Sequence, residues 1–208
     1  VNSFEADNLK GFGLLQRDRT FASYEDLEAH YQDRPSVWAV PQGDWGEGSV
    51  RLLELPAADE FGDNIVAFWE PKTPLAAGQS SEYAYELRWF NDDPALPPLG
   101  RVMTTRIADL PDTDETYRTS KEITRKFVLD FAWPGVAADA GTDKLHAAVS
   151  VQNAKLTGPF EQYNPYDHTW RVFFKASVAA PGQAVELRAF VRRENQPVTE
   201  TWIYLWNP

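Results

Sequence analysis

The sequence contains no cysteine, and only three histidines, His30, His146 and His168, are present. The lack of cysteine excludes a disulfide framework, a cysteine-ligated zinc site and thiol catalysis. The histidines lie far apart and none has a neighbour at metal-ligand spacing, so we expect no metal site. Gly11-Phe12-Gly13 lacks the later glycine of a dinucleotide fingerprint, and the glycines of 43–48 lack the Lys-Ser/Thr ending of a phosphate-binding loop. We therefore predict no cofactor.

Basic residues are scarce, with 20 against 31 acidic residues and a formal charge of −11. Such a balance repels phosphate backbones and anionic lipid, so a nucleic acid is excluded as the expected partner. The sequence also lacks an apolar run of about 20 residues, which a membrane-spanning helix needs. Its first residues, 1–5, show neither the basic nor the apolar region of an export signal. If the protein is exported, we expect the signal to lie upstream.

Aromatic residues are abundant: eight Trp, eight Tyr and twelve Phe, in a chain that is 43% hydrophobic. This composition is typical of a folded protein, and 208 residues suffice for one large domain or two smaller ones. Short apolar or alternating runs between Gly, Pro, Asn and Asp predict strands in antiparallel sandwiches. The predicted strands are 50–55, 65–69, 83–89, 126–131, 147–151, 170–175, 185–191 and 199–205. We therefore predict an all-β protein.

A polar, acidic stretch separates the two groups of predicted strands. We place a linker or extended loop at 108–118, which gives a first domain at 1–107 and a second at 119–208. The second has the size of an immunoglobulin-like sandwich, although it lacks the Cys-Trp-Cys hallmark. The first has too few predicted strands for a self-sufficient sheet domain, so we expect it to be part of a longer protein.

One helix is predicted between Ser23 and Asp33. Ser23 can cap it, and Tyr24, Leu27 and Tyr31 fall at helical spacing. Pro35 disfavours the helical conformation at the preceding residue, so the helix is expected to end near Asp33.

An acidic cluster, Asp59, Glu60 and Asp63, comes just before the predicted strand at 65–69. A carboxyl that is partly desolvated and lies beside like charges has a raised pKa, which suits a general acid in glycoside cleavage. An acidic turn with no catalytic role explains the same residues, and the pattern alone leaves both interpretations open.

The stretch 38–48 is predicted to be a loop that combines two indoles, three glycines and two carboxylates, among them Trp45 and Asp44. Exposed aromatic rings stack on sugars, and neighbouring carboxylates bind hydroxyls. The alternative is a glycine-rich turn in which Trp45 fills the core. Arg34 could likewise orient the acidic residues or only bridge a loop to a sheet.

Four sequence blocks, at 11–19, 31–36, 43–46 and 63–69, resemble the periplasmic glucan-biosynthesis G/D family in order and spacing. The resemblance extends over essentially the whole chain, as far as Glu200-Thr201-Trp202. It implies the C-terminal part of a galactose-mutarotase-like β-sandwich followed by an immunoglobulin-like β-sandwich. It also implies a periplasmic location and a role in glucans with β-1,2-linked backbones.

Some members of this family resemble inverting endo-β-1,2-glucanases. In those enzymes the general acid matches Asp63, a supporting acidic residue matches Glu60, and a tyrosine near the proton path matches Tyr31. The region 109–127 matches a loop that helps to close the site. The resemblance places the general base upstream of Val1, so the chain would hold one of the two carboxylates that inversion requires. Trp45, Arg34, Asp44 and Trp69 are the expected substrate-binding residues.

Three hypotheses follow. The protein is a glycoside hydrolase that acts on β-1,2-glucan together with its missing N-terminal part, or it binds and guides glucan without cleaving it. A third role, compatible with both, is that the second sandwich serves protein interaction, which includes a homodimer formed by residues after Tyr117.

Overall fold

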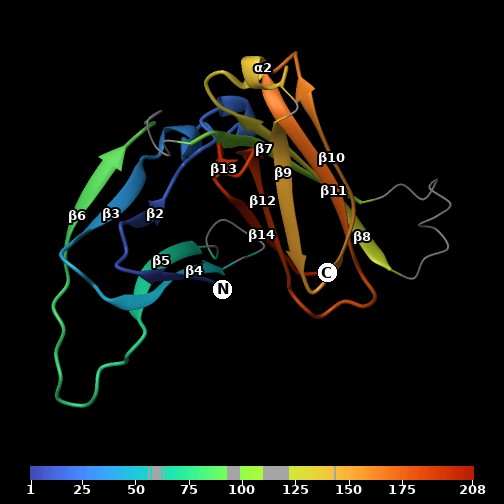
Figure 1. The fold of residues 1–208 in the computed structure, drawn as a ribbon. Helices are drawn as coiled ribbons and strands as arrows, with labels where there is room; N and C mark the ends of the chain where they lie inside the picture. The colour runs from blue at the N-terminus through green and yellow to red at the C-terminus, as the bar shows by residue number, and fades with distance from the viewer. Residues whose placement is uncertain (56, 58–61, 63, 93–98, 110–121, 143) are drawn as a thin grey trace. The chain divides into compact units, whose positions relative to one another are not determined.

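The structure is a computed structural model that describes residues 1–55, 57, 62, 64–92, 99–109, 122–142 and 144–208. Its described residues form antiparallel β-sheets with little helix, which confirms the all-β prediction (Figure 1). The chain divides into two compact units, Val1–Asp93 and Pro94–Pro208. No helix in the described part of the chain is long and apolar enough to cross a membrane.

The first unit contains two three-stranded sheets. One has the order β1-β4-β5 and the other the order β2-β3-β6. Their strands are β1 (Asn2–Asp7), β2 (Phe12–Leu14), β3 (Ser36–Gln42), β4 (Glu47–Leu55), β5 (Asn64–Pro71) and β6 (Ala84–Phe90). The strands predicted at 50–55, 65–69 and 83–89 are confirmed as β4, β5 and β6.

The expected loop at 38–48 is wrong for most of its length, because residues up to Gln42 belong to β3 and those from Glu47 to β4. A turn at 43–46 remains between them. Gly43 and Gly46 adopt φ of +84° and +74°, a conformation that side chains with a Cβ rarely adopt. The glycines thus mark a turn between two strands. Trp38 belongs to β3, and Trp45 lies in the turn.

The predicted helix is also wrong. Two short 3₁₀ turns stand in its place, η1 (Phe21–Ser23) and η2 (Tyr31–Asp33). Glu25 and His30 have positive φ, 51° and 49°, which interrupts a right-handed helix. The carboxylate of Asp26 accepts hydrogen bonds from the backbone amides of Glu28 and Ala29. This local bonding supplies the backbone with partners that a helix would otherwise provide.

The second unit is a two-sheet sandwich. One sheet has the order β10-β11-β8-β7, and in the other β13, β9 and β14 pair with β12. The strands are β7 (Arg101–Asp109), β8 (Ile123–Ala132), β9 (Leu145–Gln152), β10 (Lys155–Asn164), β11 (Thr169–Val178), β12 (Val185–Arg193), β13 (Gln196–Pro197) and β14 (Trp202–Trp206). A short helix, α2 (Val136–Asp139), follows β8. All five strands predicted in this half are confirmed.

The core of the second unit comes from every other residue of its strands. Along β11 and β12 buried and more exposed residues alternate, as expected where one face of a sheet is covered. Phe127 stacks on Phe174 with ring centroids 5.3 Å apart, and its ring lies 6.1 Å from that of Trp202 in the other sheet. These contacts across the sandwich show that the core joins its two layers.

The division between the units lies earlier in the chain than the predicted linker at 108–118. Strand β7 pairs with β8 from Arg101↔Ala132 to Asp109↔Arg125, so residues 101–107 belong to the second unit. Residues 108 and 109 are the last of β7, and 110–118 lie outside the described residues. The sequence pattern does not predict this strand, because a register shift between Val102 and Thr104 interrupts its alternation.

Candidate functional site

Glu60 and Asp63, together with Asp59, lie outside the described residues. In the sequence Asp63 immediately precedes Asn64, the first residue of β5. The assignment of Asp63 as general acid and Glu60 as its supporting residue therefore stays a prediction.

Tyr31 and Arg34 lie together in the first unit. The Arg34 guanidinium lies over the Tyr31 ring, 4.3 Å from its centroid, a cation–π contact. The ring of Tyr24 packs against the ring of Tyr31, with the two centroids 6.0 Å apart. Arg34 is exposed while Tyr31 is half-buried, so the pair presents a charged group supported by an aromatic one.

Trp45 and Trp69 form an aromatic cluster with two tyrosines. The Trp45 ring lies 6.2 Å from Trp69, 5.1 Å from Tyr83 and 6.2 Å from Tyr85. They line a cavity of about 380 Å³ between strands of both sheets of the unit. The indole N–H groups of Trp45 and Trp69 are buried and have no hydrogen-bond partner in the described residues. The cavity is lined mainly by apolar and aromatic side chains.

Asp44 has a local structural contact. Its Oδ1 accepts a hydrogen bond of 2.8 Å from the backbone amide of Gly46, which fixes the turn between β3 and β4. This turn places Trp45 beside Trp69. The side chain of Asp44 is otherwise exposed.

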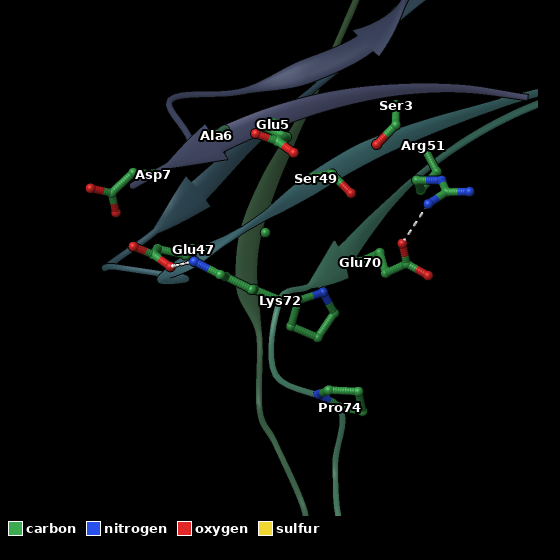
Figure 2. A pocket seen from close by; sticks show the side chains of 12 residues that line it. Ser3, Glu5, Ala6, Asp7, Glu47, Ser49, Arg51, Glu70, Lys72 and Pro74 are labelled. Atoms are coloured by element: carbon green, nitrogen blue, oxygen red, sulfur yellow. Dashed lines mark hydrogen bonds and ion pairs between the residues drawn. The ribbon is translucent and has the colours of Figure 1, made fainter.

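A second depression lies on the sheet β1-β4-β5 and is polar (Figure 2). It has a volume of about 750 Å³. We call it the polar groove, and its polar side chains are Ser3, Glu5, Asp7, Glu47, Ser49, Arg51, Glu70 and Lys72. Strand register explains why they meet: Ser3 pairs with Arg51, and Ser49 pairs with both Glu5 and Glu70. Residues at alternate positions thus share one face.

Two ion pairs cross the polar groove, as Figure 2 shows. Lys72 Nζ lies 2.5 Å from Glu47 Oε2, and Arg51 donates to Glu70 Oε2 at 2.9 Å. The hydrogen bond to Glu47, and then the charge of Glu47, raise the pKa of Lys72, and Glu5 and Asp7 add to the effect. The groove combines carboxylates, cations and hydroxyls, the groups that bind the hydroxyls of a sugar.

The structure thus brings the predicted residues into two groups, Tyr31 with Arg34 and Trp45 with Trp69. Sequence reasoning missed the polar groove, because β1 was not predicted and its partners were considered only as strand residues. The available signal was the alternation of polar and apolar residues in Asn2–Asp7, where Ser3, Glu5 and Asp7 fall on one face.

Comparison with known proteins identifies similar sequences. The family described as "Periplasmic glucan biosynthesis protein, MdoG" matches residues 1–206. A "Glucans biosynthesis protein G" of Bradyrhizobium diazoefficiens is 40% identical over 100% of the chain, and one of Pseudomonas putida is 40% identical over 93%. One of Pseudomonas aeruginosa is 38% identical over 98%. The chain spans 39%, 35% and 40% of these relatives, respectively. The match over nearly its entire length shows that the chain belongs to the periplasmic glucan biosynthesis family.

Proposed function

We propose that this chain is the glucan-handling C-terminal part of a longer periplasmic protein that acts on β-1,2-linked glucan. The observation that carries the proposal is the family match over residues 1–206, in a chain that spans 39% of the length of a relative. The missing N-terminal part supplies the rest of the first sandwich and the general base. The periplasmic location follows from the family.

The polar groove is the surface that we propose for glucan binding. Its carboxylates accept hydrogen bonds from sugar hydroxyls, while Arg51 and Lys72 donate to hydroxyl and ring oxygens. Both cations already have carboxylate partners, at 2.9 and 2.5 Å, so their positions are set before a ligand arrives. Preorganised polar groups lose less conformational entropy on binding than free ones.

The proposed reaction is inverting endo-hydrolysis. Asp63 protonates the departing glycosidic oxygen, Glu60 positions it, and a carboxylate of the upstream part activates water. Tyr31, supported by Arg34 at 4.3 Å, is proposed to lie near the path of the proton. Trp45 and Trp69 are proposed to contact glucan through the apolar faces of their indoles.

The test is reducing-end release from linear β-1,2-glucan by the full-length protein. Asp63→Asn is expected to lower the rate at least about 100-fold, because general acid catalysis contributes about 10²–10⁴-fold. Asp59→Asn, in the same cluster, is the matched control and is expected to stay within about twofold. Equal turnover by the wild-type protein and Asp63→Asn would exclude Asp63 as the acid.

A second candidate function is non-hydrolytic binding that guides nascent glucan. The observation that favours it is the name of the relatives, which describes biosynthesis. The same assay separates the two functions. Glucan binding without release of reducing ends by the full-length protein supports a binding factor, and Arg51→Ala is then expected to weaken binding about tenfold.

A further inference from the structure

The turn η2, which carries Tyr31, has a backbone acceptor that the turn itself leaves without a donor. In a 3₁₀ turn each carbonyl accepts a hydrogen bond from the amide three residues later. The carbonyl of Tyr31 does so from the amide of Arg34, at 3.3 Å. The carbonyl of Gln32 would need the amide of residue 35, which is proline and has no N–H. This carbonyl is therefore open to a donor from another segment.

Arg19 is that donor. Its Nη1 donates to the Gln32 carbonyl at 3.1 Å, and its Nη2 donates to Ser36 Oγ at 3.4 Å. Ser36 is the first residue of β3 and is only 2% exposed. The same oxygen accepts a hydrogen bond of 3.0 Å from the backbone amide of Gln16. Through Arg19 the turn is thus tied to a buried group of the sheet β2-β3-β6.

Tyr24 makes a second link to the turn, through its ring contact with Tyr31. The Tyr24 hydroxyl accepts a hydrogen bond of 2.7 Å from Gln16 Nε2 and donates one of 3.0 Å to the Asp18 carbonyl. Gln16 Nε2 also donates to that carbonyl at 3.0 Å. These three bonds form a small network that fixes the hydroxyl end of Tyr24.

Local hydrogen bonds order the segment that supplies these groups. Asp18 Oδ1 accepts a bond of 3.0 Å from the amide of Thr20. This bond, and then one from the side chain of Ser23, hold the pKa of Asp18 below its ordinary value. A carboxylate that binds the amide two residues later forms an Asx turn. The Asx turn leads the chain from Arg19 into η1 and on to Tyr24.

We propose that Arg19 and Tyr24 are positioning residues, which hold Tyr31 and Arg34 where the reaction uses them. The inference rests on the proposed function, in which Tyr31 lies near the path of the proton. A turn of three residues forms few bonds of its own, and a displacement of about 1 Å can lower a rate about 100-fold. Neither positioning residue has to touch the glucan for this role.

The first measurement is hydrogen exchange at residues 30–34 of the full-length protein, which requires no turnover. Arg19→Met removes the donors and keeps the aliphatic stem, so exchange is expected to become at least about fivefold faster. Tyr24→Phe loses the hydroxyl bonds and is expected to raise exchange about twofold. Arg19→Lys retains a donor for the Gln32 carbonyl and is expected to keep most of the protection. Arg188→Met, on β12 of the second unit, is the matched control with no expected change.

The second measurement separates kcat from KM for linear β-1,2-glucan. Arg19→Met is expected to lower kcat about tenfold and to change KM less than about threefold, because it displaces a reacting group rather than the bound sugar. Arg19→Lys is expected to keep kcat within about threefold of the wild type. Near-UV circular dichroism verifies that each variant folds.

A double variant tests whether Tyr24 acts through Tyr31. Alone, Tyr24→Phe is expected to lower kcat about fivefold. In a protein that already carries Tyr31→Phe it is expected to lower kcat less than about twofold further, because both changes then affect one group. Tyr166→Phe, at a tyrosine of the second unit that is 91% exposed, is the control and is expected to leave kcat unchanged.

Three results would overturn the inference. These are unchanged exchange at 30–34 in both Arg19→Met and Tyr24→Phe, faster exchange with kcat within about twofold of the wild type, or a double variant in which the two losses multiply. A wild-type protein without turnover contradicts the proposed hydrolysis alone. The Kd for glucan then replaces kcat, and a Kd that Arg19→Met leaves unchanged overturns the inference. If Arg19→Met does not fold, Tyr24→Phe carries the same tests.

Discussion

The two units differ in how they bury apolar residues and in charge. Val1–Asp93 has 18 acidic and 7 basic residues, and Pro94–Pro208 has 13 of each, so the first unit carries the whole formal charge of −11. Every buried hydrophobic residue of the described chain lies in the second unit. In the first, Ser36 is the single described residue that is buried. The second unit therefore has its own core, whereas the described residues of the first unit form none.

The first unit nevertheless has the residues for a core. Tyr85, Leu87 and Trp89 of β6 are 55%, 47% and 64% exposed, and β5 exposes Phe68 at 42%. Exposed apolar surface of this kind marks an interface. We propose that these strands pack against a further segment of the same protein. This segment would correspond to the part of the longer relatives that the chain does not span.

The largest expected difference between the units is in amide hydrogen exchange. In the 208-residue chain the amides of β8, β11 and β12 are expected to exchange at least about 1,000-fold more slowly than those of β5 and β6. The reason is that the opening of a packed core costs nearly the full free energy of global unfolding. Exchange measured by mass spectrometry checks this. Similar protection of β11 and β6 would contradict the comparison.

A pair of matched substitutions tests the same contrast. Phe127 is fully buried, so Phe127→Ala is expected to lower the free energy of unfolding of the second unit by about 3–5 kcal/mol. Phe68→Ala, in the first unit, is expected to cost about 1 kcal/mol or less. Urea unfolding of each variant measures both. Equal losses would show that the first unit also has a core.

Asp130 is the buried charged residue among the described residues of the second unit. Asp130→Asn removes the partner of Arg171 and Arg106 and is expected to cost about 2–3 kcal/mol, since hydrogen bonds between charged groups are the strong ones. Thr104 also donates to this carboxylate. Glu186→Gln, which removes an exposed ion pair with Arg188, is the control with little expected effect. A cost for Asp130→Asn no larger than that control would contradict the interpretation.

Asp130 also makes the stability of the second unit depend on pH. Burial raises the pKa of Asp130, but hydrogen bonds from Arg171, Arg106 and Thr104 outweigh it and hold the pKa below its ordinary 3.8. The ionised carboxylate of Asp130 thus stabilises the folded state fully above pH 3.8, and this stabilisation is lost as pH falls through the folded-state pKa. Unfolding at pH 7 and pH 3 is expected to show a smaller loss for Asp130→Asn than for the wild type. An equal loss in both would exclude this contribution.

The smallest expected effect concerns the aromatic cluster of the first unit. A Cβ on Gly48 would lie 2.4 Å from Trp69 Cζ2 and 2.5 Å from the Glu70 carbonyl oxygen, so Gly48→Ala forces the indole or the strand to move. Overpacking of this kind costs about 1–2 kcal/mol. Near-UV circular dichroism is expected to change, while Gly141→Ala, with its nearest atom at 3.6 Å, leaves the spectrum unaltered. No change for Gly48→Ala would show that Trp69 is loosely held.

Sequence patterns identified the strands that carry strong alternation or apolar runs, such as β11 and β12. They missed β1, β2, β3, β7 and β10, whose residues are polar or interrupted by Gly and Pro. In β10 a register shift between Thr157 and Phe160 breaks the alternation, and in β7 a shift between Val102 and Thr104 does the same. A bulge changes which residues face the core and so hides the period of two.

The candidate site was predictable only in part. Trp45 and Trp69 lie 24 residues apart in the sequence, and their contact depends on the pairing of β4 with β5. The polar groove depends on three strands at once, since Glu5, Ser49 and Glu70 become neighbours only through their register. The alternation in Asn2–Asp7 marks one face of β1, but no local pattern shows which residues of β4 and β5 join that face, because this depends on nonlocal pairing.

The sequence by itself determined the β class, the absence of cysteine chemistry and the family, because composition, alternation and motif spacing are properties of the chain. The tertiary structure decided which residues share a face. It placed the ion pairs of the polar groove on one side of β1-β4-β5, and it gave the second unit a core and the first unit exposed apolar strands. The reason is that burial and electrostatic contact depend on distances between strands, which the pairing of distant segments sets.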